Sequence, residues 1–317
     1  MSSYVITGGA GFIGSHLCKR LLAEGKKIIC IDNLITSSKD NIADILTNRN
    51  FVFINHDVIS ALPKIDGEIS GIFHLASPAS PNAKSPRSYI NHPIETLMVN
   101  SLGTKRLLDL SREKNSIFVY TSSSEIYGDP QISPQTEDYF GNVNPNGMRS
   151  VYDEGKRFGE SLCLTYSRSY KLDVRVIRVF NTYGPRMLKD DGRVVSNFIN
   201  QALENNPITV YGDGSQTRSF CFIDDLVEGL ILSMNVPQAA GNVINLGNPD
   251  EYKIIDLAKK IKDLVNSKSE IIHETLPTDD PHQRKPDISR AESILGFASK
   301  VTLVEGLKKT IEYFKGL

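Results

Sequence analysis

The fold is decided by Thr7-Gly8-Gly9-Ala10-Gly11-Phe12-Ile13-Gly14, which lies between an apolar run at residues 4–7 and a helical pattern at residues 12–24. Glycines permit a tight turn and a close backbone approach to a pyrophosphate, and the N-terminus of the following helix stabilises its negative charge. Asp32 ends the next apolar run, where a carboxylate accepts hydrogen bonds from the adenosine ribose and repels a 2′-phosphate. The triplet alone is weak evidence, but strand, glycines, helix, strand and acid in this order predict a dinucleotide site that prefers NAD to NADP.

Around this stretch, up to about residue 177, the chain alternates short apolar runs with longer helical patterns. The runs lie at residues 27–31, 51–54, 71–75, 117–120 and 174–177, and the helical patterns at residues 96–114 and 150–170. Because the runs are apolar nearly throughout, they are typical of parallel strands that are covered on both faces. The alternation predicts an α/β fold with a doubly wound, Rossmann-type parallel sheet.

The pattern changes after Gly184-Pro185. Short strand patterns at residues 208–210, 218–223 and 242–246 are interleaved with helical patterns near residues 194–204, 225–234, 254–265 and 303–314. We therefore predict a NAD-binding domain with the catalytic residues at 1–180 and a smaller α/β nucleotide-sugar-binding lobe at 181–317. The boundary is soft, since some strands of the lobe are expected to return to the main sheet.

Composition disfavours several classes of function. The 317 residues carry 36 Lys and Arg against 37 Asp and Glu, and this net charge of −1 disfavours nucleic-acid binding, which usually needs a basic excess. The four cysteines form no C-x-x-C pair and the histidines show no metal-ligand spacing, which disfavours zinc and disulfides. No apolar run approaches the roughly 18 residues of a membrane span, and the N-terminus lacks the basic region of a signal peptide. We therefore expect a cytoplasmic protein without a metal site.

A catalytic pattern follows the run at residues 117–120. Tyr152 and Lys156 form Y-x-x-x-K, which places them one helical turn apart on the same face. A free phenol has a pKa of about 10, but a nearby ammonium favours the phenolate, so Tyr152 is a candidate base for a sugar hydroxyl while hydride leaves the same carbon. Ser123 completes a Ser-Tyr-Lys triad. The pair alone is also compatible with an accidental exposed pair, but its place after a dinucleotide pattern favours the catalytic interpretation.

The residues expected to contact the cofactor come from the glycine-rich stretch, the ends of the apolar runs and the Tyr-Lys pair. They are Gly8, Gly11, Phe12, Ile13, Gly14, Asp32, Asn33, Asp57, Val58, Leu75, Ala76, Tyr152 and Lys156. Asp57 and Val58 are equally compatible with a contact to the adenine edge and with an ordinary loop.

Several motifs together resemble one enzyme family. They lie at residues 8–14, 74–81 (HLASPASP), 122–130 (SSSEIYGDP), 152–157 (YDEGKR), 178–187 (RVFNTYGPRM), 191–198 (DGRVVSNF), 211–218 (YGDGSQTR) and 279–287 (DDPHQRKPD). Over nearly its whole length the chain resembles the extended short-chain dehydrogenase/reductase family and, within it, the UDP-glucuronate decarboxylases. The motifs at 8–14 and 152–157 mark the superfamily only, whereas those at 74–81 and 279–287 are more specific to the decarboxylases.

This resemblance implies a redox-neutral cycle with tightly held NAD. Tyr152 and NAD oxidise C4 of UDP-glucuronate, which places a ketone β to the C6 carboxylate. The C5–C6 bond then breaks, and protonation at C5 with return of hydride gives UDP-xylose. Glu125 matches the family's active-site glutamate, with a solvated loop acid as the alternative. Arg218 matches an arginine that acts near the carboxylate, with a purely phosphate-binding role as the alternative.

The nucleotide sugar is expected to be held by polar loop residues after the strand ends, where doubly wound folds bind ligands. Guanidinium groups suit a diphosphate because they make bidentate contacts, although each arginine alone is also compatible with a surface ion pair. The candidates are Ser124, Asn181, Arg186, Arg193, Val194, Tyr211 (near the uracil ring), Gln216, Arg218 and Arg284. The resemblance further implies a homodimer that forms through a four-helix arrangement of residues 96–114 and 150–170.

Two stretches depart from the family, and rival interpretations stay open. Ser37-Ser38 stand where relatives commonly show Gly-Arg, so a cationic contact to the cofactor is missing or is supplied by Lys39. The stretch at residues 82–88 is longer than in relatives, so it alters substrate choice or bulges outward. The rivals are another NAD-dependent nucleotide-sugar enzyme, namely a UDP-glucuronate 4-epimerase or a 4,6-dehydratase, and a catalytically silent NAD-binding regulator. The intact triad and Glu125 disfavour the last of these.

Overall fold

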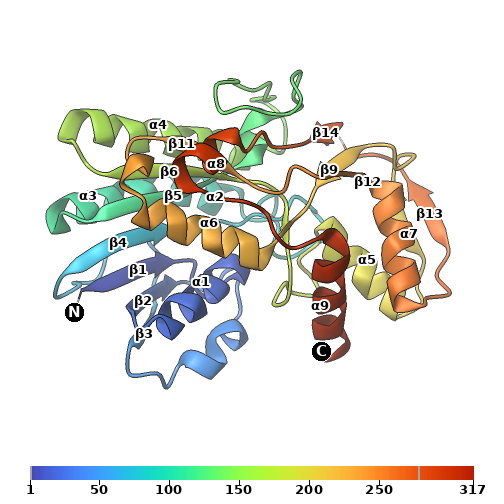
Figure 1. The fold of residues 1–317 in the computed structure, drawn as a ribbon, viewed down its shortest axis with the longest axis horizontal. Helices are drawn as coiled ribbons and strands as arrows, with labels where there is room; N and C mark the ends of the chain where they lie inside the picture. The colour runs from blue at the N-terminus through green and yellow to red at the C-terminus, as the bar shows by residue number, and fades with distance from the viewer. Residues whose placement is uncertain (1, 278) are drawn as a thin grey trace.

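A seven-stranded parallel sheet forms the centre of the molecule (Figure 1). The computed structural model, which describes residues 2–277 and 279–317, places its strands in the order β3-β2-β1-β4-β5-β6-β11. These strands are β1 (Ser3–Thr7), β2 (Lys27–Asp32), β3 (Phe51–Asn55), β4 (Ile69–His74), β5 (Ile117–Ser123), β6 (Val174–Val179) and β11 (Val243–Leu246). The sheet confirms the predicted doubly wound fold. Its strand order reverses between β1 and β4, and folds of this kind bind ligands in the crevice outside the carboxyl ends of such strands.

Helices cover both faces of this sheet. They are α1 (Phe12–Ala23) and α6 (Ile223–Asn235) on one face and α3 (Thr104–Lys114) and α4 (Ser150–Tyr170) on the other. Successive side chains of a strand point to opposite faces, so Ile6 packs with the first pair of helices and Val5 with the second. Both side chains are fully buried. Two covered faces explain why the strands are apolar throughout instead of alternating.

Two of the predicted elements are divided in the structure. The helical pattern at residues 96–114 consists of the end of α2 (Pro93–Met98), a π-helical turn η2 (Val99–Gly103) and α3. In this turn the Asn100 amide donates to Ser77 Oγ (3.0 Å), and Asn100 Oδ1 accepts from the Tyr120 hydroxyl (3.0 Å). The run at residues 218–223 is not one strand. It contains the end of β9 (Thr217–Ser219), then β10 (Cys221–Phe222), and the first residue of α6, because β9 and β10 pair with different partner strands.

The smaller lobe lies at one end of the sheet (Figure 1). Its strands are β8 (Ile208–Tyr211) paired with β13 (Ile271–Glu274), and β9 between β12 (Glu251–Lys253) and β14 (Gln283–Arg284). Its helices are α5 (Val194–Leu203), α7 (Ile254–Val265) and α9 (Leu303–Lys315). The remaining elements are β7 (Thr182–Tyr183), which pairs with β10, α8 (Ser289–Leu295), and the 3-10 turns η1 (Lys39–Ile45), η3 (Ser124–Tyr127) and η4 (Pro237–Ala239). Since β11 joins the main sheet, both halves of the chain contribute to it. The boundary at residue 180 stays a prediction.

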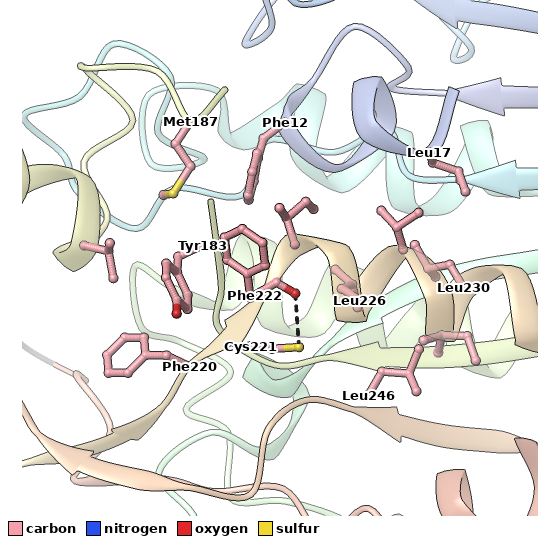
Figure 2. Close-up of a cluster of buried hydrophobic side chains, with 14 of the residues drawn as sticks. Phe12, Leu17, Tyr183, Met187, Phe220, Cys221, Phe222, Leu226, Leu230 and Leu246 are labelled. Atoms are coloured by element: carbon pink, nitrogen blue, oxygen red, sulfur yellow. Dashed lines mark hydrogen bonds between the residues drawn. The ribbon is translucent and has the colours of Figure 1, made fainter. Parts of the chain in front are cut away.

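A cluster of buried side chains joins the start of α1 to the second half of the chain. Figure 2 shows Phe12 and Met187 on the side of α1, with Tyr183, Phe222 and Leu226 facing them. All five side chains are at most 9% exposed, and burial of one such side chain contributes about 1.5–3 kcal/mol. The glycine-rich loop that precedes Phe12 is therefore held in a fixed position relative to the lobe. Within the described residues, no helix is both long and apolar enough to cross a membrane.

Candidate active site

The glycine-rich loop forms a cradle without side chains at the carboxyl end of β1. Gly8 has a φ of +70°, and a Cβ added to it would lie 2.8 Å from the backbone nitrogen of Ala76, in the turn after β4. A Cβ added to Gly14, in the first turn of α1, would lie 2.2 Å from the carbonyl oxygen of Gly8. The backbones of β1, α1 and the β4 turn therefore meet only because these positions are glycine. This leaves the backbone at the N-terminus of α1 open to an anionic ligand.

The carboxylate of Asp32 lies beside this cradle at the end of β2. It accepts hydrogen bonds from the backbone nitrogens of Ala10 (3.0 Å) and Leu34 (2.9 Å) and from the Ser37 hydroxyl (2.7 Å). Burial raises the pKa of Asp32, although these hydrogen bonds oppose the shift. Asn33 donates to the side chain of Asp57 at the end of the next strand (3.0 Å). A cradle for a pyrophosphate with an adjacent fixed carboxyl group fits NAD.

One cavity of about 940 Å³ extends from the cradle to the smaller lobe. This volume is at the upper end of the range for small-molecule sites. All of the residues predicted to contact the cofactor line it, as do the five predicted catalytic residues. Of the predicted substrate-binding residues, Ser124, Asn181, Arg193, Val194, Tyr211, Gln216 and Arg218 line it as well. The buried Asn181 Nδ2 finds no hydrogen-bond partner among the described residues, so it is available to a ligand.

The Ser-Tyr-Lys triad is assembled from β5 and α4. Ser123 ends β5, and its hydroxyl accepts from the backbone nitrogen of Glu125 (3.2 Å) as the cap of η3. Tyr152 and Lys156 are both buried on α4, with Lys156 Nζ 5.7 Å from the centre of the Tyr152 ring. Lys156 Nζ also donates to the carbonyl oxygen of Thr121 (2.8 Å). The pair is therefore not exposed.

The acidity of this triad differs from the expectation that the lysine lowers the tyrosine pKa. Burial raises the pKa of Tyr152 to about 12, although a hydrogen bond with Ser123 acts in the opposite direction. Burial also lowers the pKa of Lys156 to about 7. The reason is that desolvation disfavours the charged form of each group. A phenolate at Tyr152 would therefore need a further positive charge nearby.

Glu125 lies in a group of ion pairs next to the triad. Arg149 donates to Glu125 Oε2, and Arg284 Nη2 lies 3.3 Å from the same oxygen. Arg149 and Arg218 also pair with Asp280, at 3.4 Å and 2.9 Å. Burial would raise the pKa of Glu125, but the nearby guanidinium groups outweigh burial and lower this pKa to about 2. Glu125 is thus a fixed carboxylate surrounded by cations.

Two of the predicted substrate-binding arginines lie off the cavity surface. At Arg186 the φ of +70° in the turn after β7 directs the guanidinium to the carbonyl oxygen of Asn41 (2.8 Å) and to Asp44 (3.4 Å). This position does not support a place for Arg186 in a diphosphate clamp. Arg284 is 1% exposed and lies behind Glu125, so it acts on the cavity through that carboxylate.

Sequence reasoning missed several residues of the site. Arg149 precedes Tyr152 by almost one helical turn, and this spacing is the signal that was available for it. Asp280 lies in the Asp-Asp-Pro motif, but its pairing with Arg218 needs the tertiary structure. Tyr89 stacks on Tyr152 with ring centres 4.9 Å apart and an angle of 8° between the planes. Asp153 is buried, and its Oδ1 finds no hydrogen-bond partner among the described residues.

Asp153 makes stability depend on pH. Burial and the nearby charge of Glu125 raise the pKa of Asp153 from 3.8 to about 8, so the folded state binds a proton that the unfolded state releases above about pH 4. Stability should therefore fall as pH rises from about 4 to about 8. In Asp153→Asn the contribution of this residue to the fall should vanish, which amounts to several kcal/mol at about 1.4 kcal/mol per unit of pKa shift, as measured by thermal unfolding at several pH values. Asp66→Asn, at an exposed acid, is the control. The same pH dependence in Asp153→Asn and the parent protein would contradict this account.

Comparison with known proteins agrees with this geometry. The family model described as "NAD dependent epimerase/dehydratase family" matches residues 4–247. UDP-glucuronic acid decarboxylase 1 of Xenopus tropicalis is 47% identical over 98% of this chain and 72% of its own length. UDP-glucuronic acid decarboxylase 6 of Arabidopsis thaliana is 47% identical over 98% of this chain and 88% of its own length.

Solved structures show the same fold. UDP-glucuronic acid 4-epimerase from Bacillus cereus, in complex with UDP-glucuronic acid and NAD, superposes with a TM-score of 0.86 at 27% identity, covering 99% of both chains. UDP-glucose 4-epimerase from Thermotoga maritima, with UDP-glucose, superposes with a TM-score of 0.88 at 28% identity, again covering 99% of both chains. The identity to the decarboxylases is higher than the identity to these epimerases. This chain therefore belongs to the NAD-dependent epimerase/dehydratase family, within which it is grouped with the UDP-glucuronic acid decarboxylases.

Proposed function

We propose that the protein converts UDP-glucuronate to UDP-xylose and CO2 with NAD as a cofactor that is regenerated in each cycle. The observation that carries this proposal is the position of the ion-paired group beside the triad. Three guanidinium groups, those of Arg149, Arg218 and Arg284, are paired there with two carboxylates, those of Glu125 and Asp280. One positive charge is left over next to the base that acts on the sugar. A uronate carboxylate supplies the matching negative charge.

The first role of the chain is to take a proton from the C4 hydroxyl. Tyr152 is the base, and Ser123 donates a hydrogen bond to the reacting oxygen and holds the hydroxyl in position. The glycine cradle and Asp32 would hold NAD, which would supply the hydride acceptor for C4 and the hydride for its later reduction. Lys156 lies under the tyrosine ring, where its charged form favours the phenolate. These residues make C4 a ketone.

The second role of the chain is to support cleavage of the C5–C6 bond. A ketone at C4 is β to the carboxylate, so the electrons of the breaking bond move into an enolate whose oxygen is on C4, and C6 leaves as CO2. A proton then adds to C5, which gives the pentose after C4 is reduced. Glu125, Arg149 and Arg218 line the cavity near Tyr152, where this bond would lie. They orient the carboxylate and control access of water to C5.

Tyr152→Phe tests the base directly. This variant should lower CO2 release from UDP-glucuronate by about 10²- to 10⁴-fold, because the proton acceptor is removed while the ring is kept. CO2 release and the sugar products are followed together with NAD bound. Tyr170→Phe, at a half-exposed tyrosine on the same helix, is the matched control. Equal activity of Tyr152→Phe and the parent protein would refute this assignment.

The products of the parent protein separate the rival functions in the same assay. UDP-xylose with CO2 supports decarboxylation. UDP-galacturonate without CO2 would mean a 4-epimerase, a function that the Bacillus cereus neighbour in complex with UDP-glucuronic acid makes worth testing. No turnover of any nucleotide sugar would mean a silent NAD-binding regulator.

Glu125→Ala separates cleavage from oxidation. Without the carboxylate, the arginines lose their fixed positions, so CO2 release should fall by about 10²-fold while a first reduction of bound NAD by UDP-glucuronate persists. NADH absorbance in a single turnover measures the oxidation step. Glu125→Gln keeps the shape of the side chain and guards against unfolding of the alanine variant, and Glu154→Ala on α4 is the control. Loss of NADH formation to the same extent as CO2 release would contradict the division of roles.

We also propose a cytoplasmic homodimer that forms through helices α2, α3 and α4. Ile94 and Leu97 on α2 and Phe158 on α4 are 66%, 38% and 54% exposed, although all three are large and apolar. These residues are typical of a surface that a second copy covers. The long helices α3 and α4 lie side by side, as a four-helix interface requires.

Phe158→Glu should convert such a dimer to a monomer, because a charge in the centre of an apolar interface is costly. Light scattering coupled to size-exclusion chromatography measures the mass. Phe140→Glu, at a phenylalanine that is 86% exposed outside these helices, should leave the dimer intact. A parent protein with the mass of one chain, or a Phe158→Glu variant with the mass of two, would contradict this interface.

A further inference from the structure

The long segment between β4 and α2 is a built loop that forms part of the cavity wall. We call residues 80–89 the strap. Ser88 Oγ donates to the carbonyl oxygen of Ser80 (2.9 Å), and the backbone nitrogen of Tyr89 donates to the same oxygen (3.1 Å). The Asn91 amide closes a further turn through the carbonyl oxygen of Ser85 (2.8 Å). Residues 80–84, 87 and 89 line the cavity. The strap therefore does not simply bulge outward.

The strap is attached to the second half of the chain at residues 190–192. Ser85 Oγ donates to the carbonyl oxygen of Asp190, and Arg87 Nε donates to the Asp190 carboxylate (2.8 Å). Gly192 has a φ of +86°, and a Cβ added to it would lie 2.8 Å from Asn82 Cβ. This close packing requires glycine at 192. The strap thus crosses from the dinucleotide half to the lobe, and its last residue, Tyr89, stacks on Tyr152.

Arg87 also contacts the turn that follows β2. Its Nη1 donates to the carbonyl oxygen of Ser37 (3.4 Å), and the hydroxyl of Ser37 donates to the Asp32 carboxylate (2.7 Å). Arg87 is therefore connected through one residue to the carboxylate that marks the adenosine ribose. In contrast, Lys39 lies over the ring of Phe53, 5.5 Å from its centre, and is not among the residues that line the cavity. Lys39 does not supply the cation at this end of the site.

The lysines and the other arginines of the lining are already paired with other groups. Arg149 and Arg218 belong to the Glu125 group, and Arg193 pairs with Asp191 (2.6 Å). Lys84 pairs with Glu274 of the lobe (3.6 Å), and Lys156 lies under Tyr152. For Nη2 of Arg87, the described residues provide no hydrogen-bond acceptor, and 26% of the side chain is exposed. The Nη2 side of this guanidinium is thus open at the end of the cavity where Asp32 lies.

We propose that Arg87 binds the diphosphate of NAD on its adenosine side, and that Asp190 holds the guanidinium in place for this contact. A guanidinium group suits phosphate because its donors form a planar fork, and the ion pair with Asp190 reduces the freedom that the side chain loses on binding. Arg87 thereby takes the place of a cation on the β2 turn, where this chain has Ser37 and Ser38. The strap also covers the bound dinucleotide and slows its release.

Binding of three probes to the full-length protein tests this proposal without any turnover. In Arg87→Ala the Kd for NAD and for ADP-ribose should rise about tenfold or more, as expected for loss of a charge-assisted contact, whereas the Kd for adenosine should change less than about twofold. Arg87→Lys keeps the charge but not the fork and should give an intermediate Kd. Lys64→Ala, which removes an exposed charge paired with Asp66, is the matched control. Calorimetry measures each Kd.

The outcomes distinguish a contact to phosphate from a merely structural role. An unchanged Kd for ADP-ribose in Arg87→Ala would overturn the proposal, as would an equal loss for adenosine, which would indicate a distorted pocket. If Arg87→Ala does not fold, Arg87→Lys and Asp190→Asn provide the same comparison, and Asp190→Asn should speed NAD release in stopped-flow displacement. UDP-glucuronate is absent from these binding measurements. Failure of this test would therefore leave the proposed decarboxylation unaffected, and failure of the decarboxylation assay would leave the proposed Arg87 contact unaffected.

Discussion

Burial of a phenol and an ammonium at the carboxyl end of β5 is the constraint on which the rest of the site depends. Desolvation raises the pKa of Tyr152 to about 12 and lowers the pKa of Lys156 to about 7, so the phenol stays protonated and the amine is only partly charged near neutral pH. In such a water-poor site an added charge shifts the pKa of a nearby group strongly, because the effective dielectric constant is low. The positive nicotinamide ring of oxidised NAD is such a charge. NAD bound in the cradle would therefore favour the phenolate of Tyr152.

A nearby carboxyl group is instead held in its charged form. Glu125 is also removed from water, but its arginine neighbours more than compensate for burial, and its pKa falls to about 2. The neutral Asp153, whose pKa rises to about 8, lies within the influence of the same carboxylate. Similar side chains thus take different protonation states in one cavity, according to the cations around each. This division suits a reaction that needs a proton acceptor at C4 and a stable charged surface for the carboxylate.

Local patterns were sufficient to predict the sheet, its covering helices and the cofactor cradle, because apolar periodicity and glycine spacing act over a few residues. They did not predict the π-helical turn at Asn100, which depends on contacts with Ser77 and Tyr120 from other elements. The arginines were hardest to place. Arg186 follows a strand end as expected and Arg284 lies within the short strand β14, yet one faces Asp44 and the other lies behind Glu125. A long side chain reaches several ångströms in any direction, so its partner is decided by the fold and not by its position in the sequence.

The strap gives a second example of a basic side chain whose partner is decided by the fold. In the sequence, Ser37-Ser38 suggest that a cation is missing from the cofactor site, and the longer stretch at residues 82–88 suggests an unrelated insertion. In space the two features meet, since the guanidinium of Arg87 contacts the carbonyl oxygen of Ser37. A dinucleotide site needs positive charge beside the cofactor. That charge can come from any segment that the fold brings close to it. If Arg87 holds the cofactor as proposed, the segment that does so also ends in Tyr89, which stacks on Tyr152, the proposed base.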